Sequence, residues 1–166
     1  MRTPIASSYP PVAVDLETHL IAPGLLAPPP VVGSMCNNAG PLLLTPAAVA
    51  DLVRHSELVI GANIAFDMGV LVAHGLLSLS EAFAAYDENR IHDVLLAQAL
   101  DAIAKGHLFR DPRTGGSLRD PATGRQVGRY SLAVCSDLVL GLATAKENDL
   151  YRTRYALLDG KPTHTW

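Results

Sequence analysis

Two carboxylates stand close together at the end of an apolar run near the start of the chain. The run reads VAVDLET, and its acids are Asp15 and Glu17. If the run is a strand, residues i and i+2 point to the same side, so the two acids share a face. Two like charges about 4 Å apart repel by roughly 4 kcal/mol at an effective dielectric constant near 20. Such a pair either points into water or holds a divalent cation.

A third acid follows a second short apolar run. The stretch NIAFD, residues 63–67, comes after residues 58–62 and places Asp67 at the start of an expected helix. The N-terminus of that helix would stabilise the charge of Asp67. Three carboxylates that converge at the edge of a sheet repel one another without a cation, and they suit Mg²⁺ or Mn²⁺, which prefer oxygen ligands. The pattern therefore predicts an acidic metal site made by Asp15, Glu17 and Asp67.

The elements that must position these acids can be read from turn residues and apolar spacing. We expect strands over residues 10–17, 31–37, 41–45 and 58–62. We expect helices over residues 46–56, 65–74, 79–86, 94–105 and 130–140, the first capped by Thr45 and the last two ended by Gly106 and Gly141. Strands that come first and then alternate with helices predict an α/β domain with a mixed central sheet flanked by helices.

The amino-acid composition is typical of a folded protein. Of the 166 residues, 49% are hydrophobic and 17% are charged, which suits a single domain over residues 1–166. No apolar run approaches the roughly 18 residues that span a membrane, so we expect no membrane partner. The two cysteines, Cys36 and Cys135, form no framework, and we expect core thiols in a reducing cytoplasm.

Charge is unevenly distributed. Residues 1–104 hold 3 Lys/Arg against 10 Asp/Glu, whereas residues 105–166 hold 10 against 6. This split indicates either an acidic centre beside a basic surface or two solvated faces. Residues 106–129 are rich in Arg and Gly, repeat the turns DPRTG and DPATG, and are expected to form an exposed excursion, in the form of a hairpin. That loop either tracks a phosphate backbone or is solvated.

The two acidic stretches resemble the first two motifs of a known family. VAVDLET followed by NIAFD is similar to the motifs of the DEDD 3′–5′ exonucleases, the DnaQ-like or RNase H-like superfamily. The chain resembles in particular the proofreading exonuclease domain of family A (Pol I-type) phage DNA polymerases. The stretches IHDVLLAQAL and YSLAVCSDLVLG are similar to that family's Asp-led and Ser-Leu helices.

The resemblance implies an RNase H-like fold and a two-metal mechanism. Two divalent ions, Mg²⁺ or Mn²⁺, would act on the terminal phosphodiester bond and release nucleoside monophosphates from a single-stranded DNA 3′ end. It also implies a polymerase domain as partner and a phage or bacterial host cytoplasm as location. An RNase D-like enzyme that trims RNA 3′ ends is one alternative. A non-catalytic nucleic-acid-binding or structural remnant of a polymerase is another.

The resemblance also assigns roles to individual residues. It makes Asp15, Glu17 and Asp67 the metal ligands and catalytic groups, and it brings the terminal nucleotide to Thr18, Asn63 and Phe66. Phe66 either stacks on a base or belongs to the core. Ile21 matches an apolar position near the terminal base, and Asp93 matches an acid that caps its helix or supports the ligands.

The family's third motif is a Tyr followed four residues later by an Asp. Tyr155 and Asp159 have this spacing, but Gly160 and Pro162 end any helix there. Either these two residues form the motif, or the chain is truncated before the motif and it lies beyond Trp166. A sister group uses a His five residues before the Asp, and none of the six histidines has that spacing.

Overall fold

The computed structural model describes residues 9–24, 27–107, 110–111, 114–119, 124, 131–142 and 154–162. The chain divides into two compact units, one made by residues 1–92 and 150–166 and the other by residues 93–149. The first unit is therefore discontinuous in sequence, since a segment near the end of the chain joins the strands at its beginning.

The first unit is built around a five-stranded sheet in the order β3-β2-β1-β4-β5. The strands are β1 (Val12–Thr18), β2 (Pro30–Asn37), β3 (Gly40–Leu44), β4 (Val59–Gly61) and β5 (Ile91–Asp93). Strand β2 runs antiparallel to both β1 and β3, whereas β4 runs parallel to β1. The sheet is mixed, as the sequence predicts, with the first strand in its centre.

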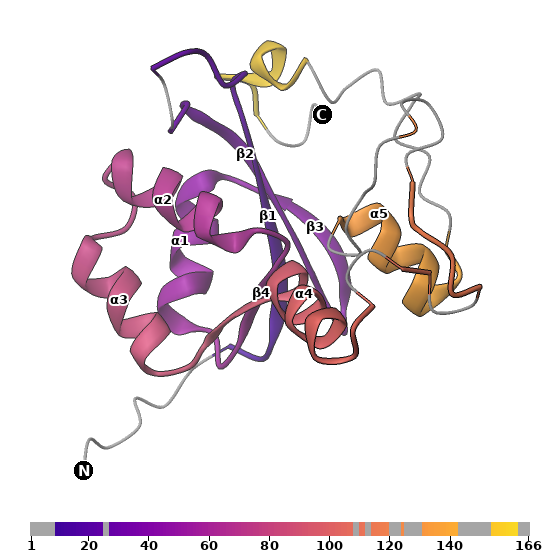
Figure 1. The fold of residues 1–166 in the computed structure, drawn as a ribbon. Coiled ribbons are helices and arrows are strands. Elements are labelled where there is room, and N and C mark those ends of the chain that lie inside the picture. The colour runs from indigo at the N-terminus through magenta and orange to yellow at the C-terminus, as the bar shows by residue number, and fades with distance from the viewer. Residues whose placement is uncertain are drawn as a thin grey trace. The chain divides into compact units, whose positions relative to one another are not determined.

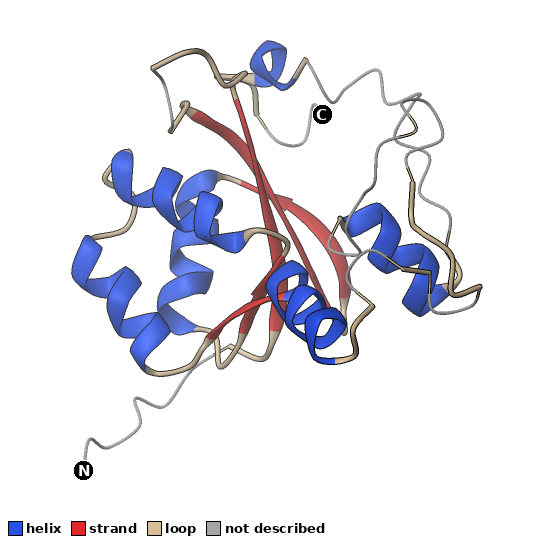
Figure 2. Ribbon diagram, in the orientation of Figure 1, coloured by secondary structure: helices blue, strands red, loops and turns tan. Residues whose placement is uncertain are grey.

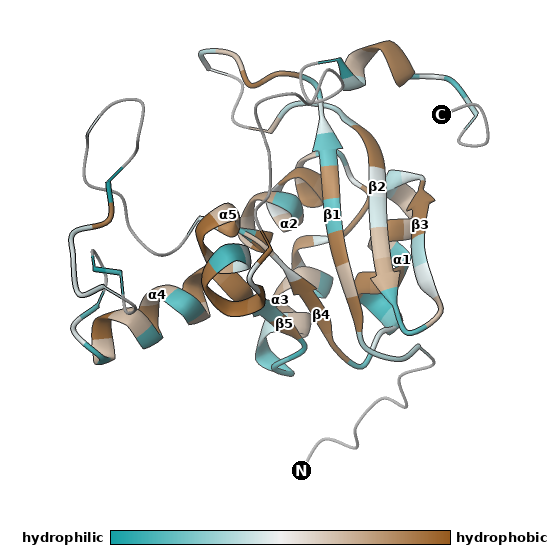
Figure 3. Cartoon of the chain, turned by 90° about the vertical axis from the view of Figure 1, so that its right-hand side faces the viewer, coloured by the Kyte–Doolittle hydropathy of each residue, from teal (hydrophilic) through white to brown (hydrophobic). Residues whose placement is uncertain are grey.

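The core lies on one face of the central strand. Val12, Val14 and Leu16 of β1 are buried, while the residues between them are not, so one face of the strand packs and the other is open. The helices α1 (Pro46–His55), α2 (Ile64–Ala73) and α3 (Leu79–Asp87) lie on the packed side (Figures 1 and 2). Figure 3 shows the same alternation of apolar and hydrophilic residues along β1, which ends in a hydrophilic tip.

Local capping explains where the helices of this unit begin. The Thr45 hydroxyl accepts from the amide of Ala48 at 3.3 Å, and Pro46 occupies the first turn of α1, as predicted. Ser78 and Glu81 form a capping box at the start of α3. Arg54 of α1 donates to the Glu81 carboxylate at 2.7 Å and to the Leu76 carbonyl at 2.6 Å, which links α1 to α3.

The described residues of the second unit form two helical segments. Asp93 caps α4 (Val94–Ala104) by accepting from the amides of Leu95 and Leu96 at 2.8 and 3.1 Å, which confirms the capping alternative for this acid. Helix α5 (Leu132–Cys135) continues as a π-helical turn, η1 (Ser136–Leu140), and ends at Gly141 with φ 66°. The predicted helix over 130–140 is therefore confirmed from residue 132 on, with a change of winding; residue 130 lies outside the described residues.

The basic excursion of this unit is described only in part. Arg110 and Ser117 form an antiparallel bridge around the first predicted turn, which agrees with a hairpin at that place. Residues 120–123, which make most of the second turn, lie outside the described residues.

One expectation from the sequence is corrected, and one strand is added. Cys36 is exposed and Cys135 is half-buried, so the prediction of core thiols is wrong: Cys36 lies near the end of β2, where the strand leaves the core. Strand β5 was not predicted, because its three residues are too few to show a period. Among the described residues, no helix has the length and hydropathy required to cross a membrane.

Candidate active site at the end of the first strand

Asp15 and Glu17 lie on the open face of β1, as their spacing predicts. Asp15 is exposed and Glu17 is half-buried, and Leu16 between them points into the core. The register with β2 shifts between Glu17 and Thr18, so the strand is irregular where the acids end. Such irregularities re-aim side chains and are common next to active sites.

Asp67 reaches the same strand from α2. Strand β4 pairs with β1 only at Val12 and Ala13, so it does not extend along the later part of β1. Helix α2 begins three residues after β4 ends, and Asp67, in its first turn, is only 5% exposed. Its carboxylate forms a hydrogen bond with the backbone of Leu16, the residue between the two acids of β1. The structure thus places Asp67 beside the strand segment that carries Asp15 and Glu17.

The three carboxylates are electrostatically coupled. Burial, and then the negative charge of Asp15, raise the pKa of Asp67 from 3.8 to about 7, and Glu17 makes a smaller contribution in the same direction. Hydrogen bonds from the backbone of Leu16 and of Asp67 itself lower this pKa, but burial and the neighbouring charges outweigh them. The expectation that the helix N-terminus would stabilise the charge of Asp67 is therefore outweighed by burial and by repulsion.

The donor set suits a divalent cation. It offers carboxylate oxygens alone, the ligands that Mg²⁺ and Mn²⁺ prefer, and a buried carboxylate beside two others is stable as an anion only near a positive charge. Within the described part of the chain, no three His, Cys, Asp or Glu side chains are gathered into a group that could hold one ion between them. The residues thus fit the ion in kind, while their side chains are not closed around a common point.

The residues expected to contact a terminal nucleotide flank the acids in the chain. Thr18 ends β1, and its hydroxyl donates to the His19 carbonyl at 2.8 Å. Asn63 is the residue before α2 and has φ 61° and ψ 40°, a left-handed conformation that Asn tolerates better than most residues. Phe66 is half-buried and packs against the core, which favours the core alternative for this ring; Ile21 is exposed.

Tyr155 and Asp159 also lie near this end of β1, in a segment that we call the C-terminal strap, residues 154–162. A single 3₁₀ turn, η2 (Tyr155–Leu158), packs against β1 and β2 (yellow in Figure 1). Asp159 follows the turn with φ −57° and ψ 132°, and its carboxylate contacts the His19 ring at 3.1 Å. Gly160, with φ 72°, follows, and the helical segment has ended before it, as the sequence predicts. The two residues therefore do not share one face of an α-helix.

The His19–Asp159 pair was not predicted. The two residues are 140 positions apart, and neither belongs to a motif that would indicate the contact. The pair joins the strap to the chain two residues after Glu17.

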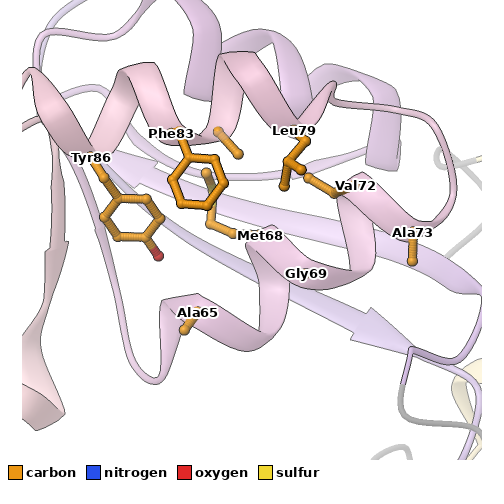
Figure 4. A pocket seen from close by; sticks show the side chains of 9 residues that line it. Ala65, Met68, Gly69, Val72, Ala73, Leu79, Phe83 and Tyr86 are labelled. Carbon is orange, nitrogen blue, oxygen red and sulfur yellow. The ribbon is translucent and has the colours of Figure 1, made fainter.

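A separate apolar groove runs between α2 and α3. It has a volume of about 360 Å³ and is lined by small and apolar residues, Ala65, Met68, Gly69, Val72, Ala73, Leu79, Ala82, Phe83 and Tyr86. Figure 4 shows the rings of Phe83 and Tyr86 facing α2 across it. No carboxylate lines this groove, so the acidic site does not include it.

Comparison with known proteins establishes the fold. No model of a protein family matches the chain, and no curated protein does. Among solved structures, the EXO domain of Nibbler from Aedes aegypti matches with a TM-score of 0.55 and 15% identity, over 90% of this chain and 67% of that one. The chain therefore has an RNase H-like α/β fold, as predicted. At this identity the likeness speaks for the fold, and the function has to be argued from the residues of this chain.

Proposed function

We propose that this protein is a metal-dependent 3′–5′ exonuclease of the DEDD type. The observation that carries the proposal is the position of Asp67, which is buried against the backbone of Leu16 between the acids Asp15 and Glu17. Three carboxylates from two separate motifs, brought to one strand end of an RNase H-like fold, are costly for stability. Their cost is understandable if they serve a cation.

Asp15, Glu17 and Asp67 would hold the divalent ions. Bound Mg²⁺ or Mn²⁺ supplies an activated water and stabilises the charge on the leaving 3′ oxygen. The chain's own contribution is to fix the ligands: the Leu16 backbone orients Asp67, and the alternation of β1 points Asp15 and Glu17 to one side. Thr18 and Asn63 are proposed to bind the terminal nucleotide, because they flank these ligands in the chain. Phe66, which packs against the core, is proposed to contact the nucleotide only with the part of its ring that stays exposed.

Single-stranded DNA with a free 3′ end is the proposed substrate. Proofreading beside a polymerase domain, in a phage or bacterial host cytoplasm, is the finer form of the proposal and rests on the resemblance of VAVDLET and NIAFD to that family. An RNase D-like activity on RNA 3′ ends uses the same ligands, so both nucleic acids belong in the test.

Release of mononucleotides tests the proposal. We expect the protein with Mg²⁺ or Mn²⁺ to shorten a 5′-labelled single strand from its 3′ end, and Asp15→Ala and Asp67→Ala to abolish the shortening. Asp87→Ala, at the exposed end of α3, is the matched control and should keep full activity. Folded Asp15→Ala and Asp67→Ala proteins that cleave like the wild type would refute the proposal.

A non-catalytic role is the second candidate. It is favoured by two observations: the side chains of the described residues do not close around an ion, and Asp159 is engaged with His19. In that case the protein binds single strands but releases no nucleotide with either metal.

For the enzyme, cleavage of an oligoribonucleotide of the same sequence distinguishes an RNA exonuclease from a DNA exonuclease.

A further inference from the structure

The C-terminal strap brings basic side chains to the acidic end of β1. Arg154 and Lys161 stand on either side of the 3₁₀ turn, and both are exposed. The only acid of the strap, Asp159, is paired with His19 at 3.1 Å. Within the described part of the chain, neither Arg154 nor Lys161 belongs to an ion pair, so the strap presents two positive charges against the one negative charge of Asp159.

The position of the strap is fixed by two kinds of contact. Its turn packs against β1 and β2, and His19, which Asp159 contacts, lies two residues after Glu17. Two residues of a strand span about 7 Å, so the residue that the strap contacts lies within about 7 Å of Glu17 along the chain. The segment that carries the two cations is thus held at the end of β1 that carries Asp15 and Glu17.

This juxtaposition has a chemical use. A nucleic acid whose 3′ end lies at Asp15 and Glu17 carries one negative charge per nucleotide into a region that repels it. Lys and Arg that contact the phosphates offset this repulsion and position the strand without reading its sequence. Arg can do so with two parallel hydrogen bonds, whereas Lys acts as a point charge.

We infer that the C-terminal strap is a phosphate-binding element for single-stranded nucleic acid, with Arg154 and Lys161 as the contacting residues. His19 is its positioning residue, because it holds Asp159 at the end of β1. The inference rests on the proposed function, since it assumes that a nucleic-acid 3′ end lies at the three carboxylates.

The salt dependence of binding tests the inference. The affinity of the whole chain for a labelled single-stranded oligodeoxynucleotide is measured by fluorescence anisotropy in EDTA, between about 50 and 200 mM salt. We expect Arg154→Gln and Lys161→Gln each to reduce the slope of log K against log salt by about 0.7, the value for one phosphate contact of a single strand. Arg154→Lys should restore the slope at that position.

Lys105→Gln is the control. Lys105 is exposed in the second unit, but Asp101 already neutralises its charge at 2.8 Å, so its removal should leave the slope unchanged. Wild-type slopes in both Arg154→Gln and Lys161→Gln would overturn the inference. A loss that occurs with the matching oligoribonucleotide but not with DNA would also overturn it, because the contact would then be to the 2′ hydroxyl.

His19→Gln tests the positioning role. The variant should have a lower affinity for the oligodeoxynucleotide in the wild-type background. Once Arg154 and Lys161 have been replaced, it should lower the affinity no further. An equal loss in both backgrounds would show that His19 acts by another route.

The nuclease assay keeps this inference separate from the proposed function. If Asp15→Ala abolishes nucleotide release while the strap variants bind like the wild type, the strap inference alone fails. If Asp15→Ala releases nucleotides normally, the proposed function fails and the inference fails with it.

Discussion

Asp67 is a buried carboxylate whose pKa in the folded chain, about 7, lies well above its ordinary value of 3.8. Between these values the folded chain holds a proton that the unfolded chain has lost, so the free energy of unfolding falls as the pH rises from about 4 to about 7. Asp67→Asn removes this dependence. In EDTA near pH 8 we expect the free energy of unfolding of the variant to exceed that of the wild type by an amount on the order of 2–4 kcal/mol. Urea denaturation near pH 5 and near pH 8 measures the difference.

Asp87→Asn is the control for this titration, because Asp87 is an exposed acid at the end of α3. It should follow the wild-type pH dependence. An Asp67→Asn protein that loses stability with rising pH as steeply as the wild type would show that Asp67 is not the group responsible.

Divalent cations should offset the loss of stability that the mutual repulsion of Asp15, Glu17 and Asp67 causes. A ligand present at a hundredfold excess over its Kd stabilises the folded state by about 2.7 kcal/mol. We therefore expect Mn²⁺ to raise the melting temperature of the wild type, and to raise it less or not at all in Asp15→Asn or Asp67→Asn. Differential scanning fluorimetry with Mn²⁺ and then with EDTA follows the effect. Equal shifts in wild type and variants would place Mn²⁺ elsewhere on the chain.

Individual residues differ in how far the sequence predicts them. The shared face of Asp15 and Glu17 follows from the period of a strand, and the cap at Asp93 follows from its place before an apolar helix. The raised pKa of Asp67 does not follow, because it depends on how deeply α2 packs against β1. The His19–Asp159 pair joins residues 140 positions apart, and no local pattern reports such a contact.

At the scale of elements, a glycine in a helix and a glycine in a strand have opposite roles. Gly69 lies inside α2, and a Cβ there would meet no atom within 4 Å, so Gly69→Ala should stabilise the helix by about 0.5–1 kcal/mol. Gly33 lies in β2 directly below α1, and a Cβ there would overlap with the Val49 side chain. Gly33→Ala should therefore destabilise the unit by about 1–3 kcal/mol. Urea midpoints of the two variants should shift in opposite directions, and a shift in the same direction would contradict this packing.

The link between α1 and α3 gives a pH dependence of the opposite sign. The Arg54 guanidinium, and then Ser78, hold the pKa of Glu81 at about 2, below its ordinary 4.5. A lowered pKa contributes stability above about pH 4.5 that is lost as the pH falls toward 2. Because the Glu81 side chain is 41% exposed, solvent screens the effect, and we expect Glu81→Gln to cost only about 1 kcal/mol near pH 7.

The same variant should differ less from the wild type near pH 3. Urea denaturation of both proteins at the two pH values checks this. A difference that is as large in acid as at neutral pH would assign the loss to the capping geometry and not to the charge.

Most elements were predictable because they have strong local signals. Thr45 before Pro46, and Gly106 and Gly141 after apolar helices, fix boundaries that the structure confirms within a few residues. Strand β5 is too short for a period, and the π-helical winding of η1 has no signature in the residue types. The order β3-β2-β1-β4-β5 is a tertiary property; what the sequence predicts is the class, a mixed sheet with helices.

At the scale of the whole molecule, the last residues of the chain belong to the same compact unit as its first strand. Residues 150–166 belong to the same unit as residues 1–92, although 57 residues of the second unit, Asp93–Asp149, separate them. The strap is the described part of this return, and it meets β1 and β2 at the end that carries the acids. Removing it therefore tests packing and electrostatics together.

Truncation after Asp149 should lower the free energy of unfolding by about 1–3 kcal/mol, because Tyr155 and Leu158 are half-buried in the strap. The His19–Asp159 pair contributes little of this, since its side chains are 33% and 59% exposed and such pairs are worth up to about 1 kcal/mol. His19→Gln should accordingly cost less than the truncation when both are compared by urea denaturation. If the two changes cost the same stability, the His19–Asp159 contact and not apolar burial holds the strap; if neither lowers the free energy of unfolding, the strap adds no stability to β1 and β2.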